Sequence, residues 1–291
     1  MANAVLAAQP YCYTQAESNY ALKSLCERMV NVALMIARTV KFILFIAPSF
    51  IYHLVHPHPA YCNPAEQREW REDNEGLYVF ISGLKSHPIW AEGHRSRLER
   101  EQPNMEVRIP SIPHNGDCSL EEAAQPIVEM IRDYIQQNPG KPICLIGTSN
   151  GGRIAAKVET ALRGEGAPIR VSALAGVFFG SQRMDRLAHW HIADYLFNPA
   201  VVQELQTGSE VSIALIEAMR AETEDPRAYE FFASANDEFI PNFSSCLPIF
   251  GRGETFRVVE GENHFSITHS ARREQLNNAR RWMEENRVVE V

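Results

Sequence analysis

Short apolar runs alternate with longer amphipathic stretches over most of the chain. The runs LYVFIS (77–82), MEVRI (105–109) and PICLIG (142–147) have the length of strands. The series continues with IRVSALAGVFFG (169–180), AYEFFASA (228–235) and ETFRVVEG (254–261). Strands separated by helices at this spacing predict an α/β fold, with a mainly parallel sheet covered by helices on both faces.

The stretches between these runs carry helix signals. Ser119 precedes LEEAAQPIVEMIRDYIQQ as an N-cap followed by acidic first-turn residues, and Asn138-Pro139-Gly140 ends that helix. Further helices are predicted over residues 89–101, 152–163 and 271–286. A ligand site is expected at the carboxyl ends of the strands.

Residues 181–227 interrupt this alternation as a long insertion that contains Trp190, Tyr195, Leu196 and Phe197. An insertion of this size inside a compact domain usually forms a lid or a binding element. We therefore predict a cap or lid-like element inside one domain, residues 71–291, preceded by an apolar helical extension, residues 1–70.

The extension contains the strongly apolar stretch Met29 to Val55. A cleavable secretory signal would begin earlier and close with small residues, so none is predicted. A membrane span would bury Arg38 and Lys41, each at a cost of roughly 2.5–3.5 kcal/mol, against a gain of about 0.3–0.6 kcal/mol for each large aliphatic residue or Phe. Three interpretations stay open: a helix packed on or over the domain, a helix on the bilayer surface, and a span. The expected location is the cytoplasm or a membrane surface.

Composition narrows the possible partners. The 291 residues include 28 Lys and Arg against 36 Asp and Glu, a net charge of −8, which argues against nucleic acid. With 45% hydrophobic residues the chain can build a core. The charge is uneven, because residues 1–60 carry +2 and the remainder −10. The negative net charge therefore does not exclude contact of residues 1–60 with a membrane.

Six cysteines without a CxxC pair are expected to be mostly reduced thiols. The run of His53, His56, His58 and Cys62 is broken by prolines and lacks the spacing of a metal site. No metal or other cofactor is therefore predicted.

The first candidate for chemistry is Ser149, within Gly147-Thr148-Ser149-Asn150-Gly151. This G-x-S-x-G lies between a predicted strand and a predicted helix, where a sharp turn needs the small residues Gly147 and Gly151. The context favours Ser149 as a nucleophile. The alternative is a glycine-rich helix start that binds nothing.

A serine hydroxyl needs a base, and the base needs an orienting acid. Asp237 follows the run AYEFFASA and His264 follows ETFRVVEG, so both are expected at strand ends. The chain order Ser149, Asp237, His264 matches a known order for this chemistry. Glu238 and His269 are the nearest substitutes for the acid and the base. As alternatives to catalysis, Asp237 could be a turn residue and His264 an ordinary loop residue.

Taken together, four stretches within about 77–286 resemble the α/β-hydrolase superfamily on its lipase and esterase side. They are FISGLKS, the elbow GTSNGG, the acid turn DEFIPNFSS and the histidine turn GENHFSI. A fifth stretch, Gly180-Ser181 followed by NPAVVQELQTGSE, is similar to triacylglycerol-lipase-like proteins. The resemblance implies that the backbone N–H groups of Leu84 and Asn150 form an oxyanion hole. Ser82 stands where lipases usually carry a histidine.

The resemblance also implies a serine hydrolase that cleaves esters with a hydrophobic acyl chain, through an acyl-enzyme and without a cofactor. The expected partners are a lipid or another hydrophobic ester, with peripheral membrane contact through residues 29–55. The superfamily also contains thioesterases, acyltransferases and members that lost catalysis. A non-catalytic, membrane-associated binding module therefore remains an alternative.

Overall fold

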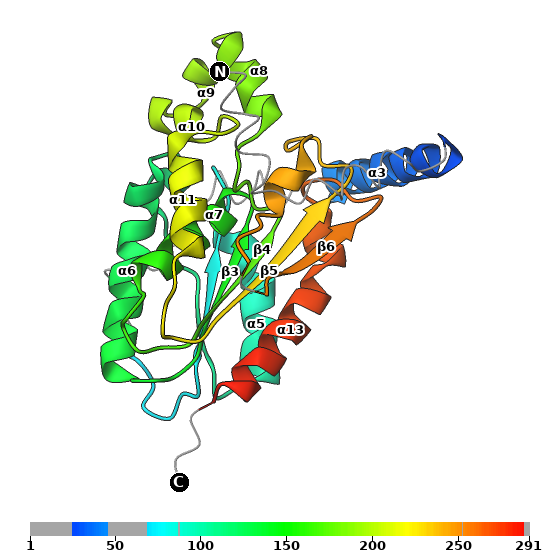
Figure 1. The fold of residues 1–291 in the computed structure, drawn as a ribbon. Helices are drawn as coiled ribbons and strands as arrows, with labels where there is room; N and C mark the ends of the chain where they lie inside the picture. Colours follow the sequence, from blue (N-terminus) through cyan, green and yellow to red (C-terminus); the bar gives the residue numbers. More distant parts are fainter. Residues whose placement is uncertain (1–24, 46–68, 87, 252, 288–291) are drawn as a thin grey trace. The chain divides into compact units, whose positions relative to one another are not determined.

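The centre of the fold is a six-stranded sheet in the order β2-β1-β3-β4-β5-β6 (Figure 1). The computed structural model describes residues 25–45, 69–86, 88–251 and 253–287. The strands are β1 (Leu77–Ile81), β2 (Glu106–Arg108), β3 (Ile143–Thr148), β4 (Ile169–Leu174), β5 (Arg227–Ser234) and β6 (Thr255–Val259). Strand β1 pairs in parallel with both neighbours, with Leu77 opposite Glu106 and Ile143. The predicted mainly parallel α/β sheet is confirmed.

The chain forms two compact units. We call residues 58–173, 221–230 and 274–291 the elbow unit, because they include Ser149. Residues 1–57, 174–220 and 231–273 are the histidine unit, because they include His264.

Helices cover both faces of the sheet in the elbow unit. On one face, α5 (Glu92–Glu101) and α13 (Arg272–Glu285) share a buried cluster with Tyr78 and Phe80 of β1. On the other face, α7 (Asn150–Ala161) contacts β1 and β3, and α6 (Leu120–Gln137) packs beside α7 (Figure 1). All five residues of β1 are consequently buried, which explains its uninterrupted apolar sequence.

Helix α6 begins and ends where its local signals predict. The Ser119 side chain accepts a hydrogen bond from the Glu122 N–H, as an N-cap does. At the other end, Asn138 is the C-cap, and Gly140 has a φ of 75°, which glycine adopts without steric cost.

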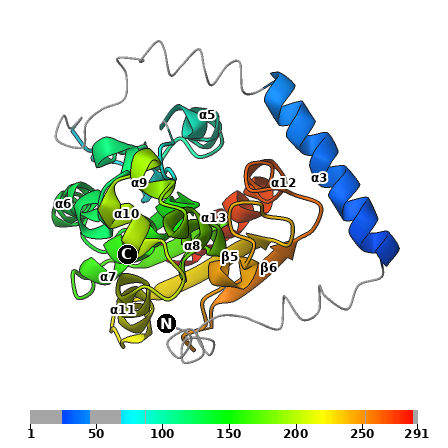
Figure 2. The same ribbon diagram turned by 90° about the horizontal axis from the view of Figure 1, so that it is seen from above.

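The insertion of the histidine unit is helical. It contains α8 (Gln182–His189), α9 (Ala193–Leu196), α10 (Pro199–Glu204) and α11 (Glu210–Arg220), which follow one another in Figure 2. The unit also holds β6, α12 (Ile267–Ser270) and α3 (Leu25–Phe45). The short 3-10 helices are η2 (Pro88–Ala91), η3 (Pro113–Gly116) and η4 (Phe243–Cys246).

The predicted strand over 169–180 is too long, because β4 ends at Leu174. Ala175 has a φ of 49°, a left-handed conformation that interrupts an extended chain. Beyond it, the N–H groups of Phe178 and Phe179 donate to Ser245, on the segment of η4. The second half of the apolar run is therefore buried loop.

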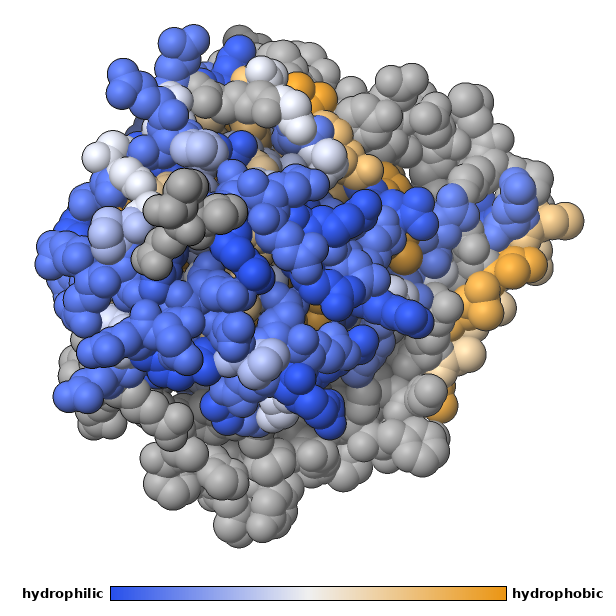
Figure 3. All heavy atoms as spheres, turned by 90° about the horizontal axis from the view of Figure 1, so that it is seen from below, coloured by the Kyte–Doolittle hydropathy of each residue, from blue (hydrophilic) through white to orange (hydrophobic). Residues whose placement is uncertain are grey.

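Helix α3 covers part of the predicted apolar stretch, and residues 46–55 of that stretch lie outside the described residues. Its exposed apolar side chains colour one edge of Figure 3 orange: Met29, Val30, Val32, Leu34, Ile36 and Val40. Within the described part of the chain, we find no helix with the length and apolarity needed to cross a membrane.

Candidate active site

Ser149 lies on a strained turn between β3 and α7. Its φ of 55° and ψ of −130° are rare for a residue with a side chain. The flanking glycines allow the turn, because a Cβ atom at position 147 would lie 2.5 Å from the Gly151 carbonyl oxygen. A Cβ atom at position 151 would lie 2.2 Å from the Ile81 oxygen. The strand, turn and helix around Ser149 thus have the arrangement of a nucleophile elbow.

The loop after β1 contacts this elbow through Gly83. A Cβ atom at position 83 would lie 2.9 Å from the Cβ of Ser149 and 3.5 Å from its Oγ. The Ser86 N–H donates to the Gly83 oxygen at 3.1 Å, which closes a turn, and the Lys85 N–H donates to the Asn115 oxygen at 2.7 Å. Gly83 is a site residue that the sequence motifs do not single out, although its place between a strand and Leu84 is a usable signal.

Two backbone N–H groups were predicted to form an oxyanion hole, those of Leu84 and Asn150. Leu84 directly follows Gly83, and its N–H takes no part in the two hydrogen bonds that hold the turn. Asn150 is the first residue of α7, where an N–H group has no acceptor within the helix. The positive end of the helix dipole lies at the same place. Leu84 and Asn150 belong to the elbow unit, as Ser149 does, and their role as oxyanion donors stays a prediction.

In the histidine unit, the structure brings Asp237 and His264 together. Asp237 follows β5, and its Oδ2 lies 2.7 Å from His264 Nδ1. Its Oδ1 accepts the N–H groups of Phe239 and Ile240, each at 2.8 Å. Asp237 is therefore a turn residue and a histidine partner at once. A proton on Nδ1 leaves His264 Nε2 as an acceptor, which is the state a general base requires.

The two substitute residues have other positions. Glu238 accepts the backbone N–H of His264 at 3.1 Å, so it binds the main chain of His264, and Asp237 binds the ring. His269 is exposed on α12, where its N–H donates to the Ser266 oxygen. The geometry thus pairs Asp237 with His264, as the chain order predicts. The catalytic roles of Ser149, Asp237 and His264 stay predictions.

Burial and two neighbouring carboxylates shift the pKa of His264, and two aromatic rings lie beside it. Burial lowers the pKa of His264, but the charge of Asp237, its hydrogen bond and the charge of Glu238 raise it, and the net pKa is above the ordinary value. The rings of Phe239 and Phe265 lie 5.2 and 5.7 Å from the imidazole. Both phenylalanines are exposed, at 43% and 41%. Sequence reasoning did not find this apolar pair.

Among the described residues, no group of three His, Cys, Asp or Glu side chains could hold a metal ion. The run from His53 to Cys62 lies outside them. None of the four described cysteines, Cys26, Cys118, Cys144 and Cys246, forms a disulfide.

No family model matches the sequence, and no curated protein matches it. Among solved structures, the mature lipase BlEst2 of Bacillus licheniformis is 15% identical, with a TM-score of 0.51 over 76% of this chain and 96% of that one. A protein of Agrobacterium vitis S4 that is named as a hydrolase is 13% identical, with a TM-score of 0.53 over 75% of this chain and 90% of that one. Likeness at these identities concerns the fold.

Proposed function

Because this chain has the α/β-hydrolase fold, we propose that it is a serine hydrolase that cleaves carboxylic esters through Ser149, His264 and Asp237. The observation that carries the proposal is the 2.7 Å hydrogen bond between Asp237 and His264, made by residues that follow two neighbouring strands. The strained elbow at Ser149 adds the nucleophile. The approach of His264 Nε2 to Ser149 Oγ is part of the proposal.

In the proposed mechanism, His264 Nε2 takes the proton of Ser149 as Oγ attacks the ester carbonyl carbon. Asp237 stabilises the imidazolium, and the N–H groups of Leu84 and Asn150 bind the oxyanion, a contribution of about 3–4 kcal/mol for one such donor. The C–O bond to the alcohol then breaks, and His264 returns its proton to the leaving oxygen. His264 then deprotonates a water molecule, whose oxygen attacks the acyl carbon, the bond from this carbon to Ser149 Oγ breaks, and His264 returns the proton to Oγ as the acid leaves.

Ser149→Ala tests the proposal with a short p-nitrophenyl ester and a fluorophosphonate probe. We expect turnover to fall by roughly 10⁴-fold or more and labelling to disappear. Ser270→Ala, which changes an exposed serine on α12, serves as the matched control and keeps both signals. Turnover in a folded Ser149→Ala protein would overturn the proposal. Wild-type protein that neither turns over the ester nor reacts with the probe would favour the binding-module alternative.

We further propose a hydrophobic acyl chain and an action at lipid surfaces. The proposal is supported by the exposed pair Phe239 and Phe265 beside His264, and by Trp190 and Tyr195 of the insertion, which are 73% and 90% exposed. The insertion would act as the cap of the substrate site, and α3 with the residues after it would make peripheral membrane contact.

Vesicle flotation separates the two apolar surfaces. The double variant Leu34→Ser/Ile36→Ser removes apolar area from α3, and Trp190→Ala/Tyr195→Ala removes it from the insertion. We expect the α3 variant to lose binding to phosphatidylcholine–phosphatidylglycerol vesicles and to keep hydrolysis of a soluble ester. Unchanged flotation of the α3 variant would contradict membrane contact through this helix. A rate of ester hydrolysis that changes neither on addition of vesicles nor with the length of the acyl chain would contradict a lipid substrate.

A further inference from the structure

Two adjacent carboxylates hold different parts of His264. Asp237 Oδ2 binds the imidazole Nδ1 at 2.7 Å, whereas Glu238 Oε2 accepts the backbone N–H of the same histidine at 3.1 Å. The histidine is therefore tied to one turn at its ring and at its main chain. The Asn263 side chain also holds this turn by accepting the N–H groups of Phe265 and Ser266, and the bond to Glu238 connects the His264 peptide to the turn that carries Asp237.

The turn that presents Glu238 is itself held in place. Asp237 Oδ1 accepts the N–H groups of Phe239 and Ile240, and Arg183 Nη1 of α8 donates to the Glu238 carbonyl oxygen at 2.9 Å. The guanidinium of Arg183 also lies over the Phe239 ring, 5.5 Å from its centroid. These contacts fix the backbone from which the Glu238 side chain reaches His264.

Most of the charged groups on the elements packed around His264 are negative. Asp237 and Glu238 contact it directly, and Glu262 lies two residues earlier in its own turn. Arg183 approaches the turn through Phe239 and the Glu238 carbonyl, and His269 is exposed on α12. An imidazolium at this position is thus attracted by Asp237, which contacts the ring, and by the nearby charge of Glu238.

We propose that Glu238 is a positioning residue for His264, which holds the histidine main chain in register with Asp237 and supplies a second negative charge to the protonated ring. The inference rests on the proposed function for its catalytic meaning. The Coulomb attraction of Glu238 is among the causes that raise the pKa of His264 against the effect of burial. Sequence reasoning treated Glu238 only as a substitute acid, whereas the geometry allows both carboxylates to act on one histidine.

Two variants separate the hydrogen bond from the charge. Glu238→Gln keeps an oxygen that can accept the His264 N–H but loses the charge, and Glu238→Ala loses both. Glu210→Gln, at the exposed start of α11, is the control that changes the net charge equally. The first measurement is an NMR titration of the His264 Cε1–H resonance, assigned by its absence in His264→Gln. The second is the pH profile of kcat and KM on a soluble ester.

We expect the titration midpoint of His264 to fall in both Glu238 variants and to stay at the wild-type value in Glu210→Gln. The acid limb of the kcat profile should move to lower pH with it. Glu238→Ala should also lower kcat at the plateau by about 10-fold with little change in KM, which corresponds to one lost hydrogen bond to a charged acceptor, and Glu238→Gln should restore part of this loss.

An unchanged midpoint in a folded Glu238→Gln protein would overturn the charge role, and an unchanged plateau in Glu238→Ala would overturn the positioning role. The titration does not require turnover, so a failure of the role of Glu238 can be distinguished from a failure of the proposed ester hydrolysis. A shifted midpoint in a protein without esterase activity would reject the proposed function and keep the coupling of Glu238 to His264. Esterase activity that neither Glu238 variant alters, with an unchanged titration midpoint, would keep the proposed function and reject the coupling of Glu238 to His264.

Discussion

At the scale of single residues, the position of the candidate nucleophile Ser149 depends on three glycines, which have no side chain to block close packing. Gly147 lies against the first turn of α7, and Gly151 lies against the backbone at the end of β1. Gly83 allows the loop after β1 to approach Ser149. A methyl group at position 83 would also lie 3.0 Å from the Thr148 oxygen, so Ser149 or the loop would have to move. Displacements of this size matter because attack on a carbonyl requires close alignment.

Gly83→Ala should therefore reduce kcat/KM on a soluble ester by about 10- to 100-fold, since a misplacement on the order of 1 Å can cost 10²-fold. The matched control is Gly93→Ala on α5, where a Cβ atom meets nothing within 4 Å. This control should keep full activity. Equal activity of the two variants, both folded by circular dichroism, would show that the loop after β1 is not part of the site.

The pH dependence follows from the raised pKa of His264. In the proposed mechanism His264 must be neutral to act as the base, so kcat/KM should rise with pH and reach its plateau above the ordinary histidine value of about 6.5. Asp237→Asn removes the main attraction and should move this limb to lower pH, together with a large loss of kcat. A limb in the wild-type enzyme that lies clearly below the ordinary value would contradict the raised pKa.

The same group contributes to stability with a definite sign. Because the pKa is higher in the folded state, the contribution is fully present below the unfolded pKa and is lost as pH rises through the folded one. The difference in unfolding free energy between wild type and His264→Gln, measured by urea denaturation, should thus shrink as pH rises through this window. A difference that grows with pH would contradict the direction of the shift.

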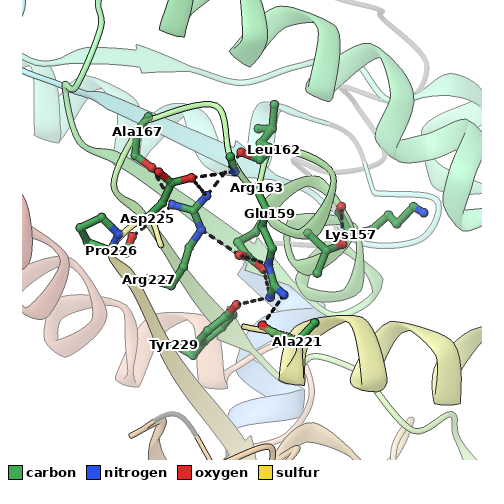
Figure 4. A network of polar contacts seen from close by, with 12 residues as sticks. Lys157, Glu159, Leu162, Arg163, Ala167, Ala221, Asp225, Pro226, Arg227 and Tyr229 are labelled. Atoms are coloured by element: carbon green, nitrogen blue, oxygen red, sulfur yellow. Dashed lines mark hydrogen bonds and ion pairs between the residues drawn. The ribbon is translucent and has the colours of Figure 1, made fainter. Parts of the chain in front are cut away.

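At the scale of elements, a buried ionic network joins the end of α7 to the start of β5 (Figure 4). Glu159 is fully buried and accepts Arg163 Nε and Arg227 Nε, each at 2.9 Å. Arg163 also donates to the Tyr229 hydroxyl at 3.0 Å, and Arg227 to the Ala167 oxygen at 2.6 Å. Since α7 carries Ser149 at its other end, the network anchors the helix that begins at the elbow.

Arg227→Met should lower the free energy of unfolding by about 2–4 kcal/mol, because it leaves buried acceptors and part of the Glu159 charge uncompensated. The control, Arg97→Met, breaks an i,i+4 pair with Glu101 at the surface of α5 and should cost at most about 0.5 kcal/mol. Urea denaturation at pH 7 measures both. Equal effects would show that the buried network adds no more than a surface pair.

At the scale of the whole molecule, cysteine accessibility reports on the fold. Cys26 is exposed, whereas Cys118, Cys144 and Cys246 are buried. Burial raises the pKa of the Cys144 thiol to about 12, against the opposing charge of Arg170, so little thiolate forms. Cys144 is therefore doubly protected from alkylation.

In native protein, iodoacetamide should modify Cys26 within minutes and leave Cys118, Cys144 and Cys246 unmodified, because thiolate and access are both required. Increasing urea should expose the three buried thiols together if they share one cooperative transition. Peptide mapping by mass spectrometry identifies each site. Rapid modification of Cys144 in the native state would contradict its burial in the sheet.

Local signals were sufficient for most strands, for α6 and for the turn at Ser149. Apolar runs, the Ser119 cap and the glycines around Ser149 act within a few residues, so the strands, α6 and the elbow could be read directly. They could not show that the apolar run after Leu174 leaves the sheet, because Phe178 and Phe179 of this run bind the distant Ser245.

The candidate site required contacts that no local pattern encodes. Asp237 and His264 are 27 residues apart, and they meet because β5 and β6 are neighbours in the sheet. Chain order identified both residues, but the folded turn determined that Asp237 binds the ring and Glu238 the main chain. The closeness of Gly83 to Ser149 likewise follows from β1 lying beside β3. The sequence by itself determines the types and the order of the candidate site residues. The distances between them depend on which strands become neighbours when apolar faces are buried.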